Sequence, residues 1–319
     1  MTSIAVLDDY QGRARSLADW ASLDGDVTYF SEPIEDLVSV LGSFEVLVLM
    51  RERTAFPREV LEKLSKLKLV VTTGMANASL DIDFLNERGV VVSGTGMSGP
   101  PGAGVPSTVE VAWALILAVF KRVTVEDQGI RAGRWQLGLP RNLAGATLAL
   151  AGLGRLGGSM VSPARAFGMS VIAWSQNLSD ERASELGVEK VSKAELLERA
   201  DVLSIHLVLS DRSRGLFRAD DLARMKRDAV LINTSRGPIV DEPALINALS
   251  NGTIAGAGLD VFDHEPLPAG HPFRSLDNTV VLPHLGYVSE AGLQSMYGQA
   301  LEDIAAFLSG HPIRTLGPA

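Results

Sequence analysis

Three short segments in the second half of this 319-residue chain carry an arginine, a carboxylate and an imidazole. The planar guanidinium of Arg236 could grip both oxygens of a substrate carboxylate. Reduction of a 2-keto acid turns its carbonyl oxygen into an alkoxide, and His284 could deliver the proton that this oxygen takes. Glu265, bonded to the far ring nitrogen, would fix the tautomer of His284 and favour its protonated form. The segments, Asn233–Gly237, Asp260–Pro266 and Pro283–Gly286, are therefore candidates for the chemistry of keto acid reduction.

Each of these residues also has an ordinary structural interpretation when it is taken alone. Arg236 could be a solvated loop residue, Glu265 an exposed carboxylate before a proline, and His284 a core histidine after a strand. Short motif matches carry a false-positive risk. The interpretation as a site therefore depends on the cofactor signature upstream.

That signature is the segment Thr147–Gly157, an apolar strand that runs into a glycine fingerprint. In such a fingerprint Gly152 permits the tight turn, Gly154 lets the backbone approach a pyrophosphate, and Gly157 lets helix pack on strand. The following helix would offer its N-terminal N–H groups to the phosphates, and Arg155 is placed to reach them. The segment therefore predicts a dinucleotide-binding unit.

A second apolar run, Val171–Trp174, follows a helical stretch through Phe167 at the spacing of a second parallel strand. It ends in Ser175, Gln176 and Asn177, where NAD enzymes of this type usually place an acid on the adenosine ribose. Without a carboxylate to repel a 2′-phosphate, NADP is admissible, and these side chains can donate hydrogen bonds to phosphate oxygens. No arginine stands beside them in the sequence, so NAD and NADP both remain open as the cofactor.

With the fingerprint and the three segments together, the chain resembles the D-isomer-specific 2-hydroxyacid dehydrogenases, a family that includes phosphoglycerate dehydrogenases and glyoxylate/hydroxypyruvate reductases. The resemblance covers nearly the whole length and implies that Arg236 orients the substrate, that His284 is the proton donor and that Glu265 is its partner. It extends to the segments Arg51–Thr54, Asp201–Leu207 and Ile254–Asp260.

The resemblance also implies where the ligands bind. Asp260 is expected to meet the nicotinamide carboxamide, and no metal is expected. The other expected cofactor contacts are Gly152, Gly154, Arg155, Leu156, Gly157, Ser175, Gln176, Asn177, His206, Leu207, Val208, Thr234, Ser235 and Gly286. The substrate carboxylate is expected on backbone N–H groups of Ala76 and Asn77. Some members place a substrate-binding arginine where Arg51 stands, although a surface arginine is an equal interpretation.

Short apolar runs alternate with helical patterns in the first hundred residues, which predicts a doubly wound parallel sheet. The runs are 4–7, 27–30, 46–50, 69–72 and 90–92, and the helical patterns are 58–67 and 82–88. The resemblance implies an α/β chain of two doubly wound domains. A discontinuous, flavodoxin-like substrate domain would comprise 1–101 and 286–319, with a last helix at 290–308. An inserted Rossmann NAD(P)-binding domain would comprise 102–285.

The most apolar segment, Val109–Val119, is too short to span a bilayer, which needs about 20 residues. We expect a buried helix with Ser107 as its N-cap and Glu110 completing a capping box. Before it, the glycine- and proline-rich stretch 93–104 is expected to be a loop between the domains.

Composition narrows the classes of partner. The net charge of −9 argues against a nucleic-acid or anionic-membrane binder, whose surface would be basic. The N-terminus has no basic region before its apolar stretch, so we expect a strand there and a cytoplasmic location. In relatives the region 125–143 wraps around a second subunit, so a homodimer is expected.

We therefore expect an NAD(P)-dependent reductase of a small 2-keto acid, with glyoxylate or hydroxypyruvate as the first choice. Phosphoglycerate dehydrogenase-like activity is one alternative. A non-catalytic, NAD(H)-sensing corepressor or scaffold is an alternative of another class. Measured turnover of a keto acid would distinguish the enzymes from this alternative.

Overall fold

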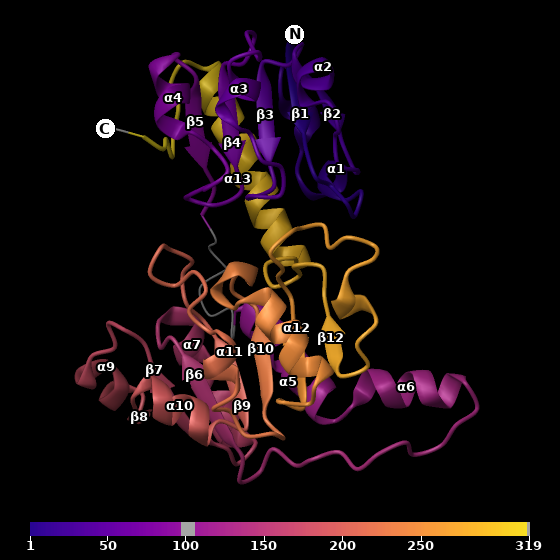
Figure 1. Cartoon of the computed structure of the whole chain (residues 1–319). Coiled ribbons are helices and arrows are strands. Elements are labelled where there is room, and N and C mark those ends of the chain that lie inside the picture. Colours follow the sequence, from indigo (N-terminus) through magenta and orange to yellow (C-terminus); the bar gives the residue numbers. More distant parts are fainter. Residues whose placement is uncertain (97–105, 318–319) are drawn as a thin grey trace. The chain divides into compact units, whose positions relative to one another are not determined.

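The computed structural model describes residues 1–96 and 106–317. By its packing the chain divides into two compact units (Figure 1): a first unit, Met1–Gly102 with Ser289–Ala319, and a second unit, Ala103–Val288. The predicted domain boundary at 101–102 and most of the expected loop at 93–104 lie outside the described residues.

The described part of the first unit contains a five-stranded parallel sheet in the order β2-β1-β3-β4-β5. The strands are β1 (Thr2–Val6), β2 (Gly25–Tyr29), β3 (Val46–Leu49), β4 (Leu69–Thr72) and β5 (Val91–Gly94). They are rich in Val, Leu and Ile, and β3 and β4 are buried along their whole length, as expected for strands covered on both faces. This order is the flavodoxin-like one, which confirms the predicted fold of this unit.

Helices cover the first sheet, and the longest of them returns from the end of the chain to pack on β4 and β5. They are α1 (Ala14–Leu17), η1 (Trp20–Ser22), α2 (Leu37–Leu41), α3 (Arg58–Leu61), α4 (Ile82–Glu87) and α13 (Glu290–Leu308). The expected helix at 58–67 was too long. After Glu62 the backbone makes tight turns, in which Lys63 N–H donates to Val60 and Leu64 N–H donates to Leu61. Turns therefore bury the leucines whose spacing predicted a helix.

In the described second unit the sheet has seven parallel strands in the order β12-β11-β10-β9-β6-β7-β8. They are β6 (Thr147–Ala151), β7 (Ser170–Trp174), β8 (Glu189–Lys190), β9 (Val202–Ile205), β10 (Val230–Asn233), β11 (Gly256–Leu259) and β12 (Thr279–Val281). Counted from β6, this is the Rossmann order 3-2-1-4-5-6 with one further strand, which confirms the predicted fold.

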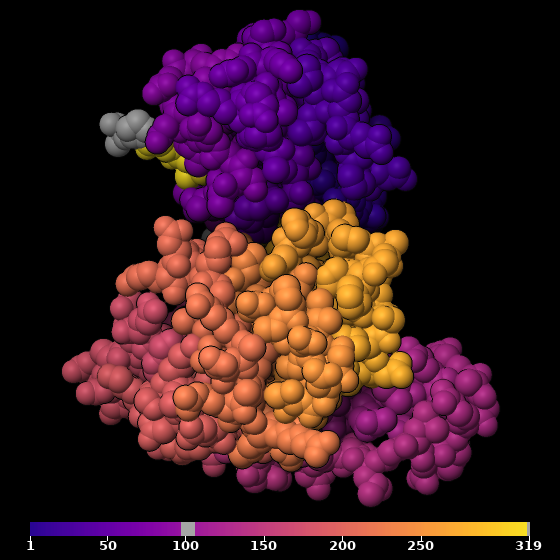
Figure 2. Space-filling model, viewed as in Figure 1, coloured from indigo at the N-terminus to yellow at the C-terminus, as the bar shows by residue number. Residues whose placement is uncertain are grey.

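Helices pack on both faces of the second sheet. The helices of this unit are α5 (Ser107–Phe120), α6 (Val123–Arg131), α7 (Arg155–Ser159), α8 (Val161–Ala166), α9 (Asp180–Glu185), α10 (Lys193–Arg199), α11 (Ala219–Leu222), η2 (Gly237–Ile239), α12 (Glu242–Ser250) and η3 (Pro272–Arg274). Of these, α6 packs against α5. Alternate residues of β6 show the two layers, because Leu148 and Leu150 belong to the core under α5 while Ala149 and Ala151 belong to the core under α10. Figure 2 shows one face of the molecule with all side chains drawn, coloured along the sequence as in Figure 1.

One local expectation in this unit was wrong. Pro106 is the N-cap of α5, and no side chain caps the helix; Ser107 is already its first residue, so the predicted capping box does not form. The helical stretch after the fingerprint is divided at Met160 into α7 and α8. Pro163 has no N–H to donate to Ser159, which explains why the hydrogen-bond ladder is interrupted there.

Candidate active site

The predicted cofactor and catalytic residues of the second unit follow the carboxyl ends of six neighbouring strands, β7, β6, β9, β10, β11 and β12. In parallel α/β sheets ligands bind at this edge, in the crevice where the strand order reverses. The order reverses between β6 and β9, so the glycine turn and the loop after β9 flank that point.

The glycine turn after β6 has the shape that a dinucleotide requires. Gly152 has a φ of +101°, and a Cβ there would lie 2.5 Å from the His206 carbonyl oxygen. A Cβ on Gly157 would lie 2.0 Å from the Gly152 oxygen, whereas no described atom lies within 4 Å of the Cβ position of Gly154. At the end of β10, the buried Thr234 hydroxyl has no hydrogen-bond partner among the described residues. These features fit a bound dinucleotide, because Gly152 and Gly157 allow close backbone packing, Gly154 leaves room for a phosphate, and the Thr234 hydroxyl can still form a hydrogen bond.

The loop after β9 contacts both the glycine turn and the loop after β10. The His206 imidazole is hydrogen-bonded through Nε2 to Ser204 Oγ at 2.9 Å, and burial lowers the pKa of His206 to about 4. It is therefore neutral at neutral pH and adds no charge to the edge. The Ser235 hydroxyl donates to the Leu207 carbonyl oxygen, and Val208 lies exposed.

The expected ribose rim lies at the end of β7. Gln176 and Asn177 are exposed and Ser175 is half-buried. Sequence reasoning missed Arg182 on α9, whose Nε donates to the Leu153 carbonyl oxygen at 3.1 Å and whose Nη1 pairs with Glu185 at 3.1 Å. No motif could have found it, because the contact joins a helix to a turn 29 residues earlier. Arg155 and Leu156 open α7, where Arg155 is exposed.

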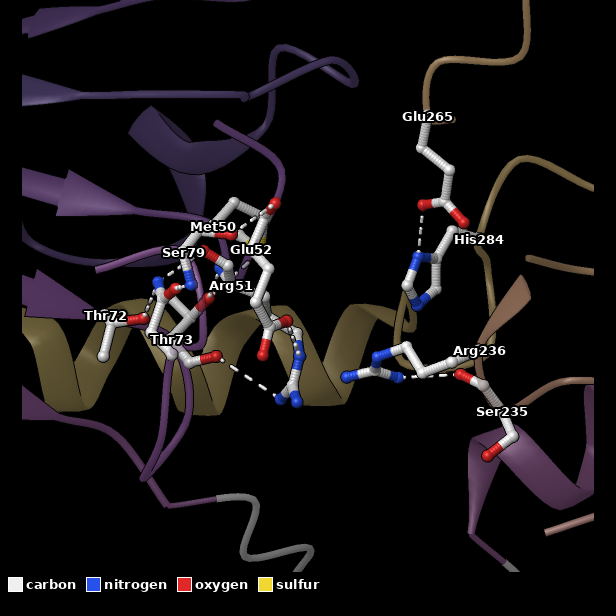
Figure 3. Close-up of polar contacts among 11 residues, drawn as sticks. Met50, Arg51, Glu52, Thr72, Thr73, Ser79, Ser235, Arg236, Glu265 and His284 are labelled. Carbon is white, nitrogen blue, oxygen red and sulfur yellow. Dashed lines mark hydrogen bonds and ion pairs between the residues drawn. The ribbon is translucent and has the colours of Figure 1, made fainter. Parts of the chain in front are cut away.

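His284 and Glu265 form the most direct pair of the site (Figure 3). Glu265 Oε2 lies 2.7 Å from His284 Nδ1, and Glu265 Oε1 accepts a hydrogen bond from the Phe262 N–H at 2.9 Å. The other ring nitrogen, Nε2, points away from Glu265. His284 has a φ of +55°, a left-handed conformation that is uncommon outside glycine and recurs at functional sites. The Tyr287 ring lies at 78° to the imidazole, with the ring centroids 5.2 Å apart.

Arg236 stands on the loop after β10 in a half-buried position. Its Nη1 donates to the Ser235 carbonyl oxygen at 2.8 Å. The loop is held by Asn233, whose amide donates to the Arg236 carbonyl oxygen at 2.9 Å and accepts from the Ser235 N–H at 3.0 Å. Asn233 was not predicted as a site residue, although it opens the same five-residue segment.

Asp260 is fully buried at the end of β11. Its two carboxylate oxygens accept hydrogen bonds from the N–H groups of Leu285, at 2.7 Å, and Gly286, at 2.8 Å. Burial raises the pKa of Asp260 even though these two bonds lower it. The carboxylate thus holds the turn that directly follows His284, and Thr108 Oγ1 binds the Gly286 carbonyl oxygen at 2.8 Å. The expected contact of Asp260 with the nicotinamide stays a prediction.

In the first unit the structure brings together two of the three predicted substrate residues (Figure 3). Arg51 follows β3 with a φ of +52°, and its N–H donates to Thr73 Oγ1 at 2.9 Å. The Asn77 amide donates to the Arg51 carbonyl oxygen at 2.7 Å and to Thr72 Oγ1 at 2.9 Å. Ala76, which directly precedes Asn77 on the loop after β4, lies exposed. Their roles toward substrate stay predictions.

No group of three or more potential metal ligands occurs in residues 1–96 and 106–317. Within the same ranges, every helix is too short or too polar to cross a bilayer.

Comparison with known proteins gives consistent matches. Residues 113–286 match the family model described as D-isomer specific 2-hydroxyacid dehydrogenase, NAD binding domain. A glyoxylate reductase of Korarchaeum cryptofilum (strain OPF8) is 36% identical over 258 residues, which are 79% of this chain and 76% of that protein. A D-3-phosphoglycerate dehydrogenase of Bacillus subtilis (strain 168) is 32% identical over 88% of this chain but only 52% of that protein. A crystal structure described as a putative D-3-phosphoglycerate dehydrogenase oxidoreductase from Ralstonia solanacearum has a TM-score of 0.92 at 34% identity, covering 100% of this chain and 97% of that one.

Proposed function

The chain belongs to the D-isomer specific 2-hydroxyacid dehydrogenases, which are NAD-dependent oxidoreductases that act on a CH–OH group, and we propose that it reduces glyoxylate or hydroxypyruvate. The observation that carries the proposal is the 2.7 Å contact between Glu265 and His284 at the strand edge that also bears Arg236. An arginine fork and a carboxylate-oriented imidazole are the groups that a 2-keto acid needs.

In the proposed reaction a bound nicotinamide would supply the hydride to the carbonyl carbon. His284 donates a proton from Nε2 to the oxygen as it gains negative charge, and takes the proton back in the reverse direction. Glu265 holds Nδ1–H, so that Nε2 is the nitrogen that exchanges the proton, and its charge offsets that of the imidazolium. Arg236 grips the substrate carboxylate with its guanidinium.

The choice of glyoxylate or hydroxypyruvate is supported by the extent of the matches. The relative named glyoxylate reductase aligns over most of its own length, whereas the relative named D-3-phosphoglycerate dehydrogenase aligns over about half of its length. Phosphohydroxypyruvate reduction uses the same proton donor and carboxylate grip, so it is the second candidate. The exposed and neutral Gln176 and Asn177 support use of both NADH and NADPH.

The test is oxidation of NADH and of NADPH by the purified protein with glyoxylate, hydroxypyruvate, pyruvate and phosphohydroxypyruvate. We expect turnover with glyoxylate or hydroxypyruvate and with both cofactors. Turnover with phosphohydroxypyruvate alone would move the assignment to the second candidate. Tight cofactor binding without turnover on any of these acids would contradict the proposal and favour the sensor alternative.

We further propose a homodimer formed through the region 125–143. After α6 this region exposes Trp135 at 75% and Leu139 at 96% of their surface, and Ile130 on α6 is also exposed. Large apolar side chains gathered on one exposed segment are typical of an interface. Sedimentation should give a dimer, and a monomer at every concentration would contradict this.

A further inference from the structure

A half-buried pair of hydrogen-bonded side chains lies close to the candidate site and has no role in the chemistry proposed above. Glu242, in the first turn of α12, places Oε1 3.0 Å from Nε2 of His271. The two side chains are 15% and 14% exposed. Because the backbone N–H of Phe273 donates to His271 Nδ1 at 3.3 Å, the ring proton lies on Nε2 and points to Glu242.

The second oxygen of Glu242 reaches the segment that carries Glu265. Glu242 Oε2 accepts a hydrogen bond from the Asp263 N–H at 3.2 Å. The preceding N–H, of Phe262, donates to Glu265 Oε1, which leaves Oε2 for His284. Two consecutive backbone N–H groups are therefore held by two different carboxylates, one in the site and one outside it.

The same turn is fixed from its opposite side. A Cβ at Gly237 would lie 2.1 Å from the Phe262 carbonyl carbon and 2.6 Å from the Asp263 nitrogen, so these backbones are in direct contact. Gly237 directly follows Arg236. The Phe273 ring packs against both the Phe262 ring, at 6.2 Å, and the His271 ring, at 5.0 Å. The 262–263 turn is therefore clamped between the Arg236 loop and the Glu242–His271 pair.

We infer that Glu242 and His271 are positioning residues, which hold the 262–263 turn and through it keep Glu265 against the His284 imidazole. Neither Glu242 nor His271 contacts the His284 ring directly. The inference rests on the proposed function for its effect on turnover, but the hydrogen bond between Glu265 and His284 can be observed without turnover.

Glu242→Gln tests the pair with almost no change of volume. An amide has one acceptor oxygen, so it can accept from His271 or from Asp263 but not from both. Asp201→Asn is the matched control, since Asp201 has a side chain 12% exposed and accepts from Arg141, from Lys226 and from the Thr147 N–H at 2.8 Å. Asp201 precedes β9, at the opposite edge of the sheet from the site.

The first measurement is the pair of ¹⁵N chemical shifts of the His284 ring, which report the hydrogen bond on Nδ1. The chain has only five histidines, so the signals can be assigned by substitution. We expect Glu242→Gln to move the His284 shifts in the same direction as Glu265→Gln, and Asp201→Asn to leave them in place. Unchanged His284 shifts in a folded Glu242→Gln protein would overturn the inference, whether or not the wild-type protein turns over a keto acid.

The second measurement is steady-state kinetics. Glu242→Gln should lower kcat by up to roughly a hundredfold, the effect of displacing a catalytic group by about 1 Å, with KM for the keto acid and Kd for NADH unchanged. His271→Leu should behave in the same way, while His271→Gln, which keeps a donor toward Glu242, should recover most of the rate. Equal loss in His271→Leu and His271→Gln, or the same loss in Asp201→Asn, would show a general structural effect and contradict positioning.

Discussion

The substitution Asp260→Asn tests whether this buried carboxylate holds the turn after His284 or contacts the cofactor. In the structure both Asp260 oxygens accept backbone N–H groups, from Leu285 and Gly286, within 2.8 Å. Asparagine keeps the shape but offers one acceptor and one donor, so one of the two N–H groups would face an NH₂ group. The turn after His284 would then lose one of the two bonds that hold it.

The loss of stability in Asp260→Asn can be worked out from the one hydrogen bond that is lost. A lost hydrogen bond to a charged group costs about 1.5–3 kcal/mol, and a buried N–H without a partner costs about 1–3 kcal/mol. Burial raises the pKa of Asp260, so a neutral amide recovers part of that loss. We expect a net destabilisation of roughly 2–4 kcal/mol, or on the order of 10 °C in the Tm of a unit of this size.

Thermal unfolding, NADH titration and steady-state kinetics together decide the role. We expect a lower Tm and a lower kcat, because the His284 turn is loosened. Thr108→Val is a graded control, since it removes one neutral hydrogen bond to the same turn and should cost only about 1 kcal/mol. An unchanged Tm with much weaker NADH binding would show that Asp260 does not hold the turn after His284, and would assign it to the cofactor.

Three further substitutions test other parts of the account. His284→Ala should lower kcat by roughly two to four orders of magnitude, the usual contribution of a general acid, while NADH binding persists in titration; a near-normal rate would remove His284 from that role. Arg236→Lys keeps the charge but loses the fork, so KM for the keto acid should rise strongly, and an unchanged KM would place the grip elsewhere. Burial raises the pKa of Asp303 on α13 from 3.8 to about 7 despite its ion pair with Arg314. The folded chain then holds a proton that the unfolded chain has released, so stability in urea should fall between these two pKa values as pH rises, by at most about 1.4 kcal/mol per pH unit, and level off above pH 7. Asp303→Asn should abolish this slope, and a slope that persists would locate the titration at another group.

Much of the fold could be predicted from the sequence because the apolar runs are short, regular and separated by helical patterns. Strand β4 and helix α13 occupy the predicted residues. Helix α13 also has a local start signal, since the Ser289 side chain accepts a hydrogen bond from the Gly292 N–H. Where the local signal and the periodicity agree, the bounds follow directly from the sequence.

The errors come from competition between local signals. Ser107 and Glu110 have the spacing of a capping box, but Pro106 takes the cap position and moves the serine inside the helix. The leucines from Leu61 to Leu67 have helical spacing, but tight turns bury them equally well. The leucine pattern thus identified the buried face and not the backbone conformation.

The residues that carry chemistry could be found from motifs, whereas those that hold them in place could not. Glu242 meets the Asp263 N–H across 21 residues, and Arg182 meets Leu153 across 29. A backbone N–H has no residue type, so a carboxylate that binds one leaves no pattern in the sequence. Such partners are visible only once the loops at the edge of the sheet are placed together.

We propose that His284 and Glu265 act with Arg236 to reduce a 2-keto acid to its D-hydroxy acid. The most direct measurement supplies hydroxypyruvate with NADH that carries deuterium at both C4 positions, and determines the label and the chirality of the glycerate formed. We predict D-glycerate with deuterium at C2, and loss of its formation in His284→Ala. L-glycerate, unlabelled glycerate, or undiminished product from His284→Ala would contradict the claim.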